Sequence, residues 1–153
     1  MRLPRPRSLA RGPVARRNGF SLLEVLIVGF ILVVAMTLAL ARWQGYSAQQ
    51  RLRFGTAQVA TDLRQAQERA KAERAAYTVT FVAASSAYII ARSGGGFAEN
   101  TRLPDQVTAT ASQVVTFDAF GRPAAVYTVT VQNWMGSGTA TVNAMGGIQY
   151  QTP

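Results

Sequence analysis

The 153-residue chain contains no cysteine and no histidine. Without cysteine it forms no disulfide and offers no thiol nucleophile, and without either residue the usual ligands of structural zinc are missing. The absence of histidine also removes the side chain that most often acts as a general base near neutral pH. The sequence therefore excludes zinc fingers, thiol catalysis and histidine-dependent catalysis, although the lack of cysteine leaves the compartment open.

Acidic side chains are also scarce, seven against sixteen basic ones, which gives a net charge of +9. Six arginines precede residue 18, namely Arg2, Arg5, Arg7, Arg11, Arg16 and Arg17. From Phe20 onward ten basic side chains face seven acidic ones, a net charge of only +3. A basic chain suggests a nucleic-acid partner, but here most of the positive excess belongs to a short N-terminal segment.

Residues 1–19 form this basic segment, which has little apolar content and no periodicity. Such a composition predicts a disordered leader. Arginines beside an apolar span stay in the cytoplasm under the positive-inside rule, so the C-terminal part is expected on the outer side of the membrane. The competing interpretation, a nucleic-acid-binding tail, does not account for the apolar run that follows.

An apolar run extends from Phe20 to Ala41 and carries one charge, Glu24. At about 1.5 Å per residue its 22 residues cover roughly 33 Å, which exceeds a bilayer core of about 30 Å. Arg42 and Trp43 follow as a cation and an interfacial aromatic. The run predicts a single membrane-spanning helix. Two rival interpretations are an ordinary signal anchor and a secretory signal cleaved after Ala39-Leu40-Ala41, and neither explains Glu24.

The junction between leader and span reads Gly19-Phe20-Ser21-Leu22-Leu23-Glu24. This motif resembles the processing site of the type IV pilin superfamily, which includes the pseudopilins of type II secretion systems. The resemblance implies cleavage after Gly19 by the prepilin peptidase and N-methylation of Phe20. It also implies a single-pass inner-membrane protein whose partners are other pilin or pseudopilin subunits and the inner-membrane assembly platform, and which ends in a fibre.

Glu24 is the one carboxylate within the span. A charge in hydrocarbon is costly and usually functional, and an opposite charge offsets that cost when the geometry is good. The free ammonium of a cleaved Phe20 is the natural partner, either one turn away in the same helix or in a neighbouring subunit. The resemblance implies the intersubunit role, in which Glu24 sets the register of assembly; the competing interpretation is a glutamate that reaches the membrane surface.

Residues 42–76 continue the helix, because they are rich in alanine, glutamine, arginine and glutamate and no proline occurs between Pro13 and Pro104. Apolar residues recur on one face at helical spacing, namely Leu52, Val59, Leu63, Ala66 and Ala70. We expect this stripe to pack on a sheet. The acids Asp62, Glu68 and Glu73 are interpreted as a solvated helix face.

Residues 77–153 alternate between β-branched or aromatic and polar side chains, which predicts short strands. The expected strands are 77–82, 87–91, 114–118, 126–131, 139–143 and 148–150, with a flexible loop from Ser93 to Pro104. A long helix followed by strands predicts an α+β fold in which the helix packs on an antiparallel sheet. The predicted organisation is thus a leader (1–19), a span (20–41), a helical continuation (42–76) and a β domain (77–153).

The C-terminal third carries a second resemblance. Leu103-Pro104, then Phe117-x-x-x-Gly121-x-Pro123, a Thr/Val strand and a terminal hairpin around Gly146-Gly147 resemble the GspH/FimT family of minor pilins and pseudopilins. Some members bind DNA during uptake through arginines near that hairpin. Here the hairpin has no basic residue, so DNA is not the favoured partner, and Arg92, Arg102 and Arg122 are the residues that would contact it.

No catalytic or metal-binding constellation emerges from the sequence. The acids form no tight cluster, the serines have no histidine to activate them, and the glycine triplet Gly94-Gly95-Gly96 lacks the lysine and spacing of a phosphate-binding loop. We therefore expect a structural subunit with no enzyme activity, metal or cofactor. The alternatives are a minor pilin that binds DNA during transformation and a secreted or membrane-anchored protein unrelated to pili.

Overall fold

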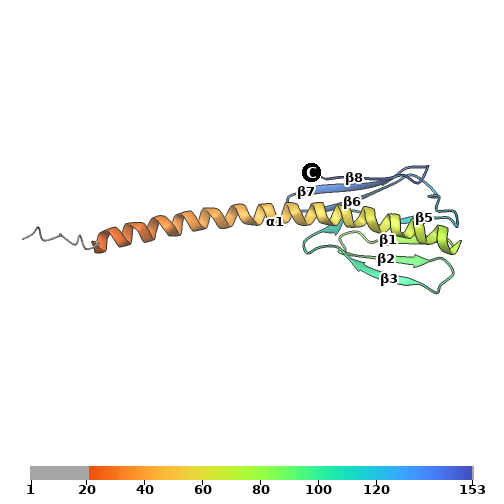
Figure 1. Ribbon diagram of the computed structural model, residues 1–153, viewed down its shortest axis with the longest axis horizontal. Helices are drawn as coiled ribbons and strands as arrows, with labels where there is room; N and C mark the ends of the chain where they lie inside the picture. Colours follow the sequence, from red (N-terminus) through yellow and green to blue (C-terminus); the bar gives the residue numbers. More distant parts are fainter. Residues whose placement is uncertain (1–20, 153) are drawn as a thin grey trace, which may run out of the picture. The chain divides into compact units, whose positions relative to one another are not determined.

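The computed structural model describes residues 21–152, without the side chain of Ala41. The chain falls into two units, one up to Leu38 and one from Ala39 to Pro153, and each is described by itself. One helix, α1 (Leu22–Glu73), supplies the whole of the described secondary structure of the first unit and the first element of the second (Figure 1). The predicted cleavage site, Gly19 and Phe20, lies outside the described residues.

Helix α1 ends in a left-handed residue. Arg74 has φ of 49°, and the N–H of Ala75 donates to the carbonyl of Ala70 over 3.2 Å. This bond closes the last turn in the manner of a Schellman cap, where the left-handed position is usually glycine. The helix therefore stops at Glu73, three residues before the predicted end, and the chain turns into the first strand.

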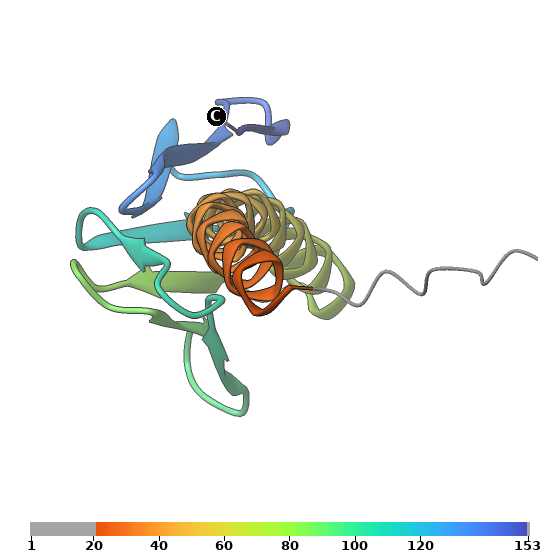
Figure 2. The ribbon, with the colours of Figure 1, turned by 90° about the vertical axis from the view of Figure 1, so that its left-hand side faces the viewer.

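Eight strands follow α1 in the second unit. They are β1 (Tyr77–Phe81), β2 (Ala87–Arg92), β3 (Ala98–Arg102), β4 (Thr108–Ala109), β5 (Gln113–Phe117), β6 (Tyr127–Asn133), β7 (Gly136–Val142) and β8 (Ile148–Gln151). They form two four-stranded sheets, in the orders β3-β2-β1-β5 and β4-β6-β7-β8, and every pairing is antiparallel. Figure 2, which looks along the helix, shows the two sheets around one side of it.

The core lies between the helix and the inward faces of both sheets. All five residues of the predicted stripe are buried, and they belong to one cluster with residues from seven of the eight strands and with Leu103, which directly follows β3. Strand β1 shows why its sequence forms a strand here, since Tyr77, Val79 and Phe81 are buried while the threonines between them are not. Burial of alternating side chains on one face is what a sheet packed on one side requires.

Small residues let the helix approach the β elements closely. A Cβ on Gly55 would lie 3.3 Å from Pro104 and from Val107, and a Cβ on Gly138 of β7 would lie 2.1 Å from the Thr56 hydroxyl. Thr56 is itself fully buried, and its hydroxyl donates to the Leu52 carbonyl over 2.8 Å. These contacts fix the helix against both the β3–β4 connection and the second sheet.

A side-chain amide ties the helix to two loops. The Nε2 of Gln67 donates to the carbonyls of Gly121 (2.8 Å) and Gly146 (3.1 Å). Both glycines have positive φ, 74° and 84°, and a Cβ on either would clash with helix side chains. Glycine is needed at both positions for its backbone freedom and for the close approach.

The predicted α+β fold, a long helix packed on antiparallel strands, is confirmed. The predicted loop from Ser93 to Pro104 is wrong in part, because β3 lies inside it and pairs with β2. The three glycines of that segment, all with positive φ, instead form the turn between β2 and β3. The division of the chain at residues 19, 41 and 76 stays a prediction from the sequence.

Candidate functional site: the apolar helix and its carboxylate

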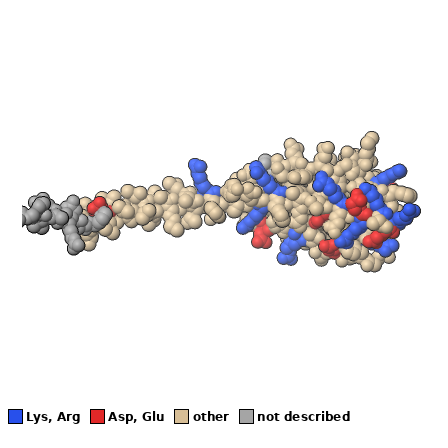
Figure 3. Space-filling view, viewed as in Figure 1, with Lys and Arg blue, Asp and Glu red and all other residues tan. Residues whose placement is uncertain are grey.

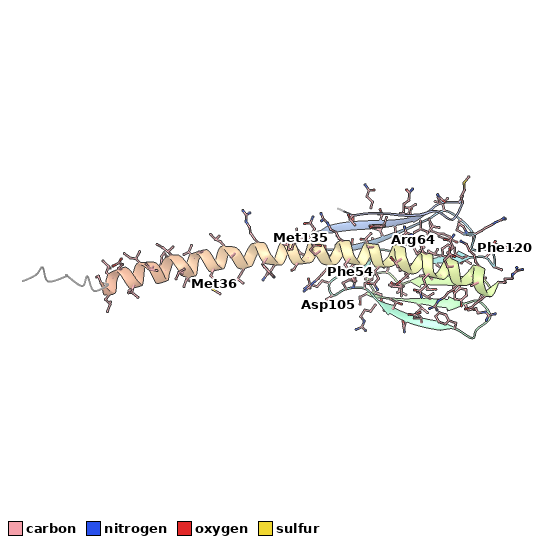
Figure 4. The ribbon with its side chains drawn as sticks, viewed as in Figure 1. Met36, Phe54, Arg64, Asp105, Phe120 and Met135 are labelled. Carbon is pink, nitrogen blue, oxygen red and sulfur yellow. The ribbon has the colours of Figure 1, made fainter. Side chains whose placement is uncertain are left out.

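The first half of α1 is exposed along its whole length. Every described side chain from Ser21 to Leu40 is exposed, and the segment is long and apolar enough to cross a membrane. Figure 4 labels Met36, which is 67% exposed in this segment. Water does not favour an apolar surface of this size on an isolated chain, so the segment requires lipid or other helices around it.

Glu24 lies in the first turn of α1. Its side chain is exposed, and the helix start is held by a bond from the Val25 N–H to the Ser21 carbonyl of 3.2 Å. The positive end of the helix dipole favours a carboxylate at this position. The three ion pairs within residues 21–152 all join other side chains, so the described part of the chain supplies no cation for Glu24.

The three candidate DNA-contacting arginines do not form one cluster. Arg92 ends β2 and is paired in register with Tyr77, whereas Arg102 ends β3 opposite Ala87 at the other end of β2. These two ends are five residue steps apart along β2, about 17 Å at roughly 3.3 Å per step. Arg122 follows β5, whose last residue, Phe117, is also paired with Tyr77. Arg92 and Arg122 are thus brought to one end of the sheet, and Arg102 to the other.

Acids neutralise several cations of the second unit. Arg92 pairs with Glu73 and Arg69 with Glu99, each over 3.5 Å, and Lys71 pairs with Glu68 over 2.8 Å. Arg122 instead lies near the Phe120 ring, 6.0 Å from its centroid. Figure 3 shows lysines, arginines and acids interspersed over the visible face of this unit. A surface of mixed sign is a poor match for a phosphate backbone.

The expectation that Asp62 belongs to a solvated helix face is wrong, because its carboxylate is partly buried against β2. The Tyr88 hydroxyl from β2 donates to its carboxylate, and Gln58 donates to both the Tyr88 oxygen (3.4 Å) and the Arg102 carbonyl (3.1 Å). Burial raises the pKa of Asp62 above its usual 3.8, with a further contribution from Glu99, although the bond from Tyr88 opposes the shift. Tyr88 is 26 residues away, so no local pattern could have revealed this contact.

No metal or catalytic site is apparent in the part of the chain that the structure describes. Residues 21–152 contain no group of three acidic side chains arranged to hold a metal ion. The surface hollows of the second unit are lined mostly by threonine, glutamine and other polar residues, with an arginine in two of them and Trp134 or Tyr150 in two.

Comparison with known proteins bears on the fold. A scan against protein-family models finds no match, and no curated protein matches in sequence. The structure is similar to the crystal structure of the type IV minor pilin FimU from Pseudomonas aeruginosa, with a TM-score of 0.55 and 15% identity. The match covers 69% of this chain and 92% of that chain. The chain therefore has the fold of a type IV minor pilin.

Proposed function

We propose that the chain is a minor pilin or pseudopilin, a structural subunit and not an enzyme, which assembles into a type IV pilus or a type II secretion pseudopilus. The observation that carries the proposal is α1 itself: one helix joins an exposed apolar segment with Glu24 in its first turn to the buried stripe of a pilin-like domain. The C-terminal motif around Phe117 and Pro123 supports a place in the GspH/FimT family.

Processing precedes assembly in this proposal. The prepilin peptidase cleaves after Gly19 at the cytoplasmic face of the inner membrane and methylates the new N-terminus at Phe20. The mature protein then spans the membrane once through residues 20–41, with its β domain outside. The support is the sequence at the junction, together with the exposed apolar helix that begins at Leu22.

Glu24 acts in assembly. In the fibre, the apolar segments of neighbouring subunits replace lipid as the low-dielectric surroundings, where attraction between opposite charges is strong and an isolated charge is costly. The Phe20 ammonium of an adjacent subunit supplies the opposite charge. The ion pair therefore stabilises one axial register between neighbouring subunits relative to the others. This gives an otherwise uniform apolar helix a defined position in the fibre.

The test separates assembly from processing. Glu24→Ala and Glu24→Gln are expected to be cleaved normally, because cleavage is directed by Gly19, but to be recovered in sheared fibres far less than wild type. Gln keeps the size of the side chain without its charge, so an equal defect in both variants isolates the charge. Glu68→Ala is the matched control, since Glu68 is an exposed acid of the second unit that pairs with Lys71. Incorporation of Glu24→Ala at the wild-type level would contradict the register role.

A DNA-binding role is not proposed. Arg102 lies apart from Arg92 and Arg122, Arg92 is paired with Glu73, and the terminal hairpin has no basic residue.

A further inference from the structure

Large apolar side chains gather where the second unit begins. Trp43 and Tyr46 of α1 are 73% and 63% exposed, and Trp134 and Met135, in the turn between β6 and β7, are 64% and 46% exposed. We refer to these four residues as the aromatic end. Figure 4 places Met135 near the first turns of α1 in this unit and Phe120 at the opposite end. Tight turns usually carry glycine, asparagine, aspartate or serine, so two large apolar side chains at this tip require an explanation.

The turn is held firmly against the helix. The Nδ2 of Asn133 donates to the Ala48 carbonyl over 2.7 Å, and its Oδ1 accepts from the Met135 N–H over 2.9 Å. Met135 lies beside Gly45, where an added Cβ would be 3.9 Å from the methionine methyl group. Trp134 lines a hollow together with Gln44 and Ser47. Asn133 thus fixes both the conformation of the β6–β7 turn and the position along α1 at which the turn lies.

The aromatic end surrounds the helix at one level. Successive helical residues are rotated by about 100°, so Gly45 lies roughly 200° from Trp43, on the opposite side of α1. Met135, beside Gly45, therefore occupies the side opposite Trp43. Apolar groups on opposite sides at one level suit a planar boundary between polar and apolar surroundings better than a partner that docks from one side. Tryptophan and tyrosine are enriched at that boundary of a membrane.

The level agrees with the position of the predicted span. Ala39, Leu40 and Ala41 end the apolar run and are the first residues of the second unit. Gln44 and Ser47 follow Ala41 by three and six residues, about 5 and 9 Å along the helix. The polar layer of each leaflet is about 5–7 Å thick, taken as half the difference between the full bilayer and its core. Gln44 thus lies within that layer and Ser47 just beyond it, so Trp134, which lines a hollow with both, is held at the outer edge of the lipid headgroups.

The charges near the aromatic end favour the same surroundings. Arg42 and Arg51 lie on these turns of α1, and Arg51 lines the hollow beside Trp134 with Gln106. Asp105 precedes Gln106 in the sequence, and Figure 4 places it at this end of the unit. Two cations against one carboxylate leave a small positive excess, which suits the phosphates of anionic phospholipids.

We propose that the aromatic end rests in the headgroup layer of the membrane before assembly, with Trp134 and Met135 entering the lipid surface. This inference deepens the proposed function and depends on the membrane insertion given there. The β6–β7 turn then acts as a second membrane contact, in addition to the helix. It holds the β domain in one orientation at the bilayer, which prepares the subunit for extraction into a fibre.

The two tryptophans of the chain, Trp43 and Trp134, allow a direct test. Full-length Trp43→Phe and Trp134→Phe variants each keep one tryptophan and are reconstituted in phosphatidylethanolamine–phosphatidylglycerol vesicles that contain a headgroup-nitroxide lipid. The nitroxide is expected to reduce Trp134 emission as strongly as Trp43 emission. A third variant replaces both tryptophans with phenylalanine and carries Phe120→Trp. Phe120 is 70% exposed at the far end of the unit, so its replacement should retain full emission.

Each result decides the matter. Quenching of Trp43 without quenching of Trp134 overturns the inference and leaves the proposed insertion intact. Absence of quenching for Trp43 as well overturns both, because the span is then outside the bilayer. Equal quenching at position 120 shows adsorption of the whole domain and overturns the specific contact. A blue shift of Trp134 emission that grows with the protein-to-lipid ratio, without nitroxide quenching, assigns the aromatic end to a neighbouring copy of the chain and overturns the lipid contact.

Discussion

Leu63 offers a quantitative test of the stripe on which the fold depends. It is fully buried at the centre of the stripe and belongs to the main core cluster. Every buried hydrophobic residue of the described chain lies between Ala48 and Ile148, so a fragment of residues 42–153 retains the whole core and should fold alone as a monomer. Truncation of a buried leucine to alanine removes its transfer free energy and leaves a cavity, at a cost of about 2–5 kcal/mol.

The expected change in melting temperature follows from the size of the fragment. An unfolding entropy of about 2.1 cal/mol/K per residue gives roughly 0.24 kcal/mol/K for a fragment of this length, so each kcal/mol lowers Tm by about 4 °C. Leu63→Ala should therefore lower Tm by about 8–20 °C. Leu63→Asp adds a buried charge without a partner, which costs several kcal/mol more and approaches the total stability of about 5–15 kcal/mol of a small domain. We expect that variant to be largely unfolded.

The assay is thermal unfolding followed by circular dichroism, with Gln65→Ala and Gln65→Asp as controls. Gln65 is an exposed residue of the same helix, two positions from Leu63. Its replacement changes helix propensity by less than about 0.7 kcal/mol, so Tm should move by no more than about 3 °C. If Leu63→Asp melted at the wild-type temperature, the stripe would face solvent or a partner helix, and the core described above would be wrong.

Further predictions concern processing, packing, pH and charge. Mass spectrometry of membrane-extracted protein should find a mature N-terminus at methylated Phe20; a terminus at Arg42 would indicate ordinary secretion instead. Gly138→Ala should cost about 1–3 kcal/mol because its Cβ overlaps Thr56, and a Thr56→Ala partner mutation should recover part of that loss in a double-mutant cycle. The raised pKa of Asp62 means that the folded state holds its proton to higher pH than the unfolded state, so this group's contribution to stability should fall as pH rises above 3.8. Thermal melts of Asp62→Asn at pH values from 3.8 upward should lack this pH-dependent loss of stability. DNA should bind residues 42–153 weakly, and tight, salt-sensitive binding lost on Arg92, Arg102 or Arg122 substitution would restore the uptake role.

Most of the fold could be predicted from the local spacing of apolar residues along the sequence. The stripe from Leu52 to Ala70 repeats at helical spacing, and β1 alternates at strand spacing, so each pattern reports directly on the face that the fold buries. Strand β3 was not predicted from the sequence, because Ala98–Arg102 lies at a sheet edge with nearly all of its side chains exposed. An edge strand with no buried face needs no apolar alternation, and the preceding glycines favoured a loop.

The division of the strands between two sheets depends on long-range pairing. β5 pairs with β1, whereas β6, which follows it in sequence, pairs with β4 and β7. The sequence of β5 and β6 predicts strands but holds no local signal for the choice of neighbour. The contact of Asp62 with Tyr88 has the same origin. Sequence patterns report which face of an element is buried, and they do not report which distant element buries it.

The candidate site, unlike the strand pairing, can be recognised from residues that are close together in the sequence. Glu24 stands out in the sequence and in the structure on the same ground: it is the one charge in a segment whose described side chains are all exposed and otherwise almost entirely apolar. The second half of α1 has its own sheets to cover its stripe, whereas the first half has no cover within the described chain. The exposed half of α1 therefore needs lipid or other helices to cover it, and in such surroundings a lone carboxylate is costly unless a cation lies near it.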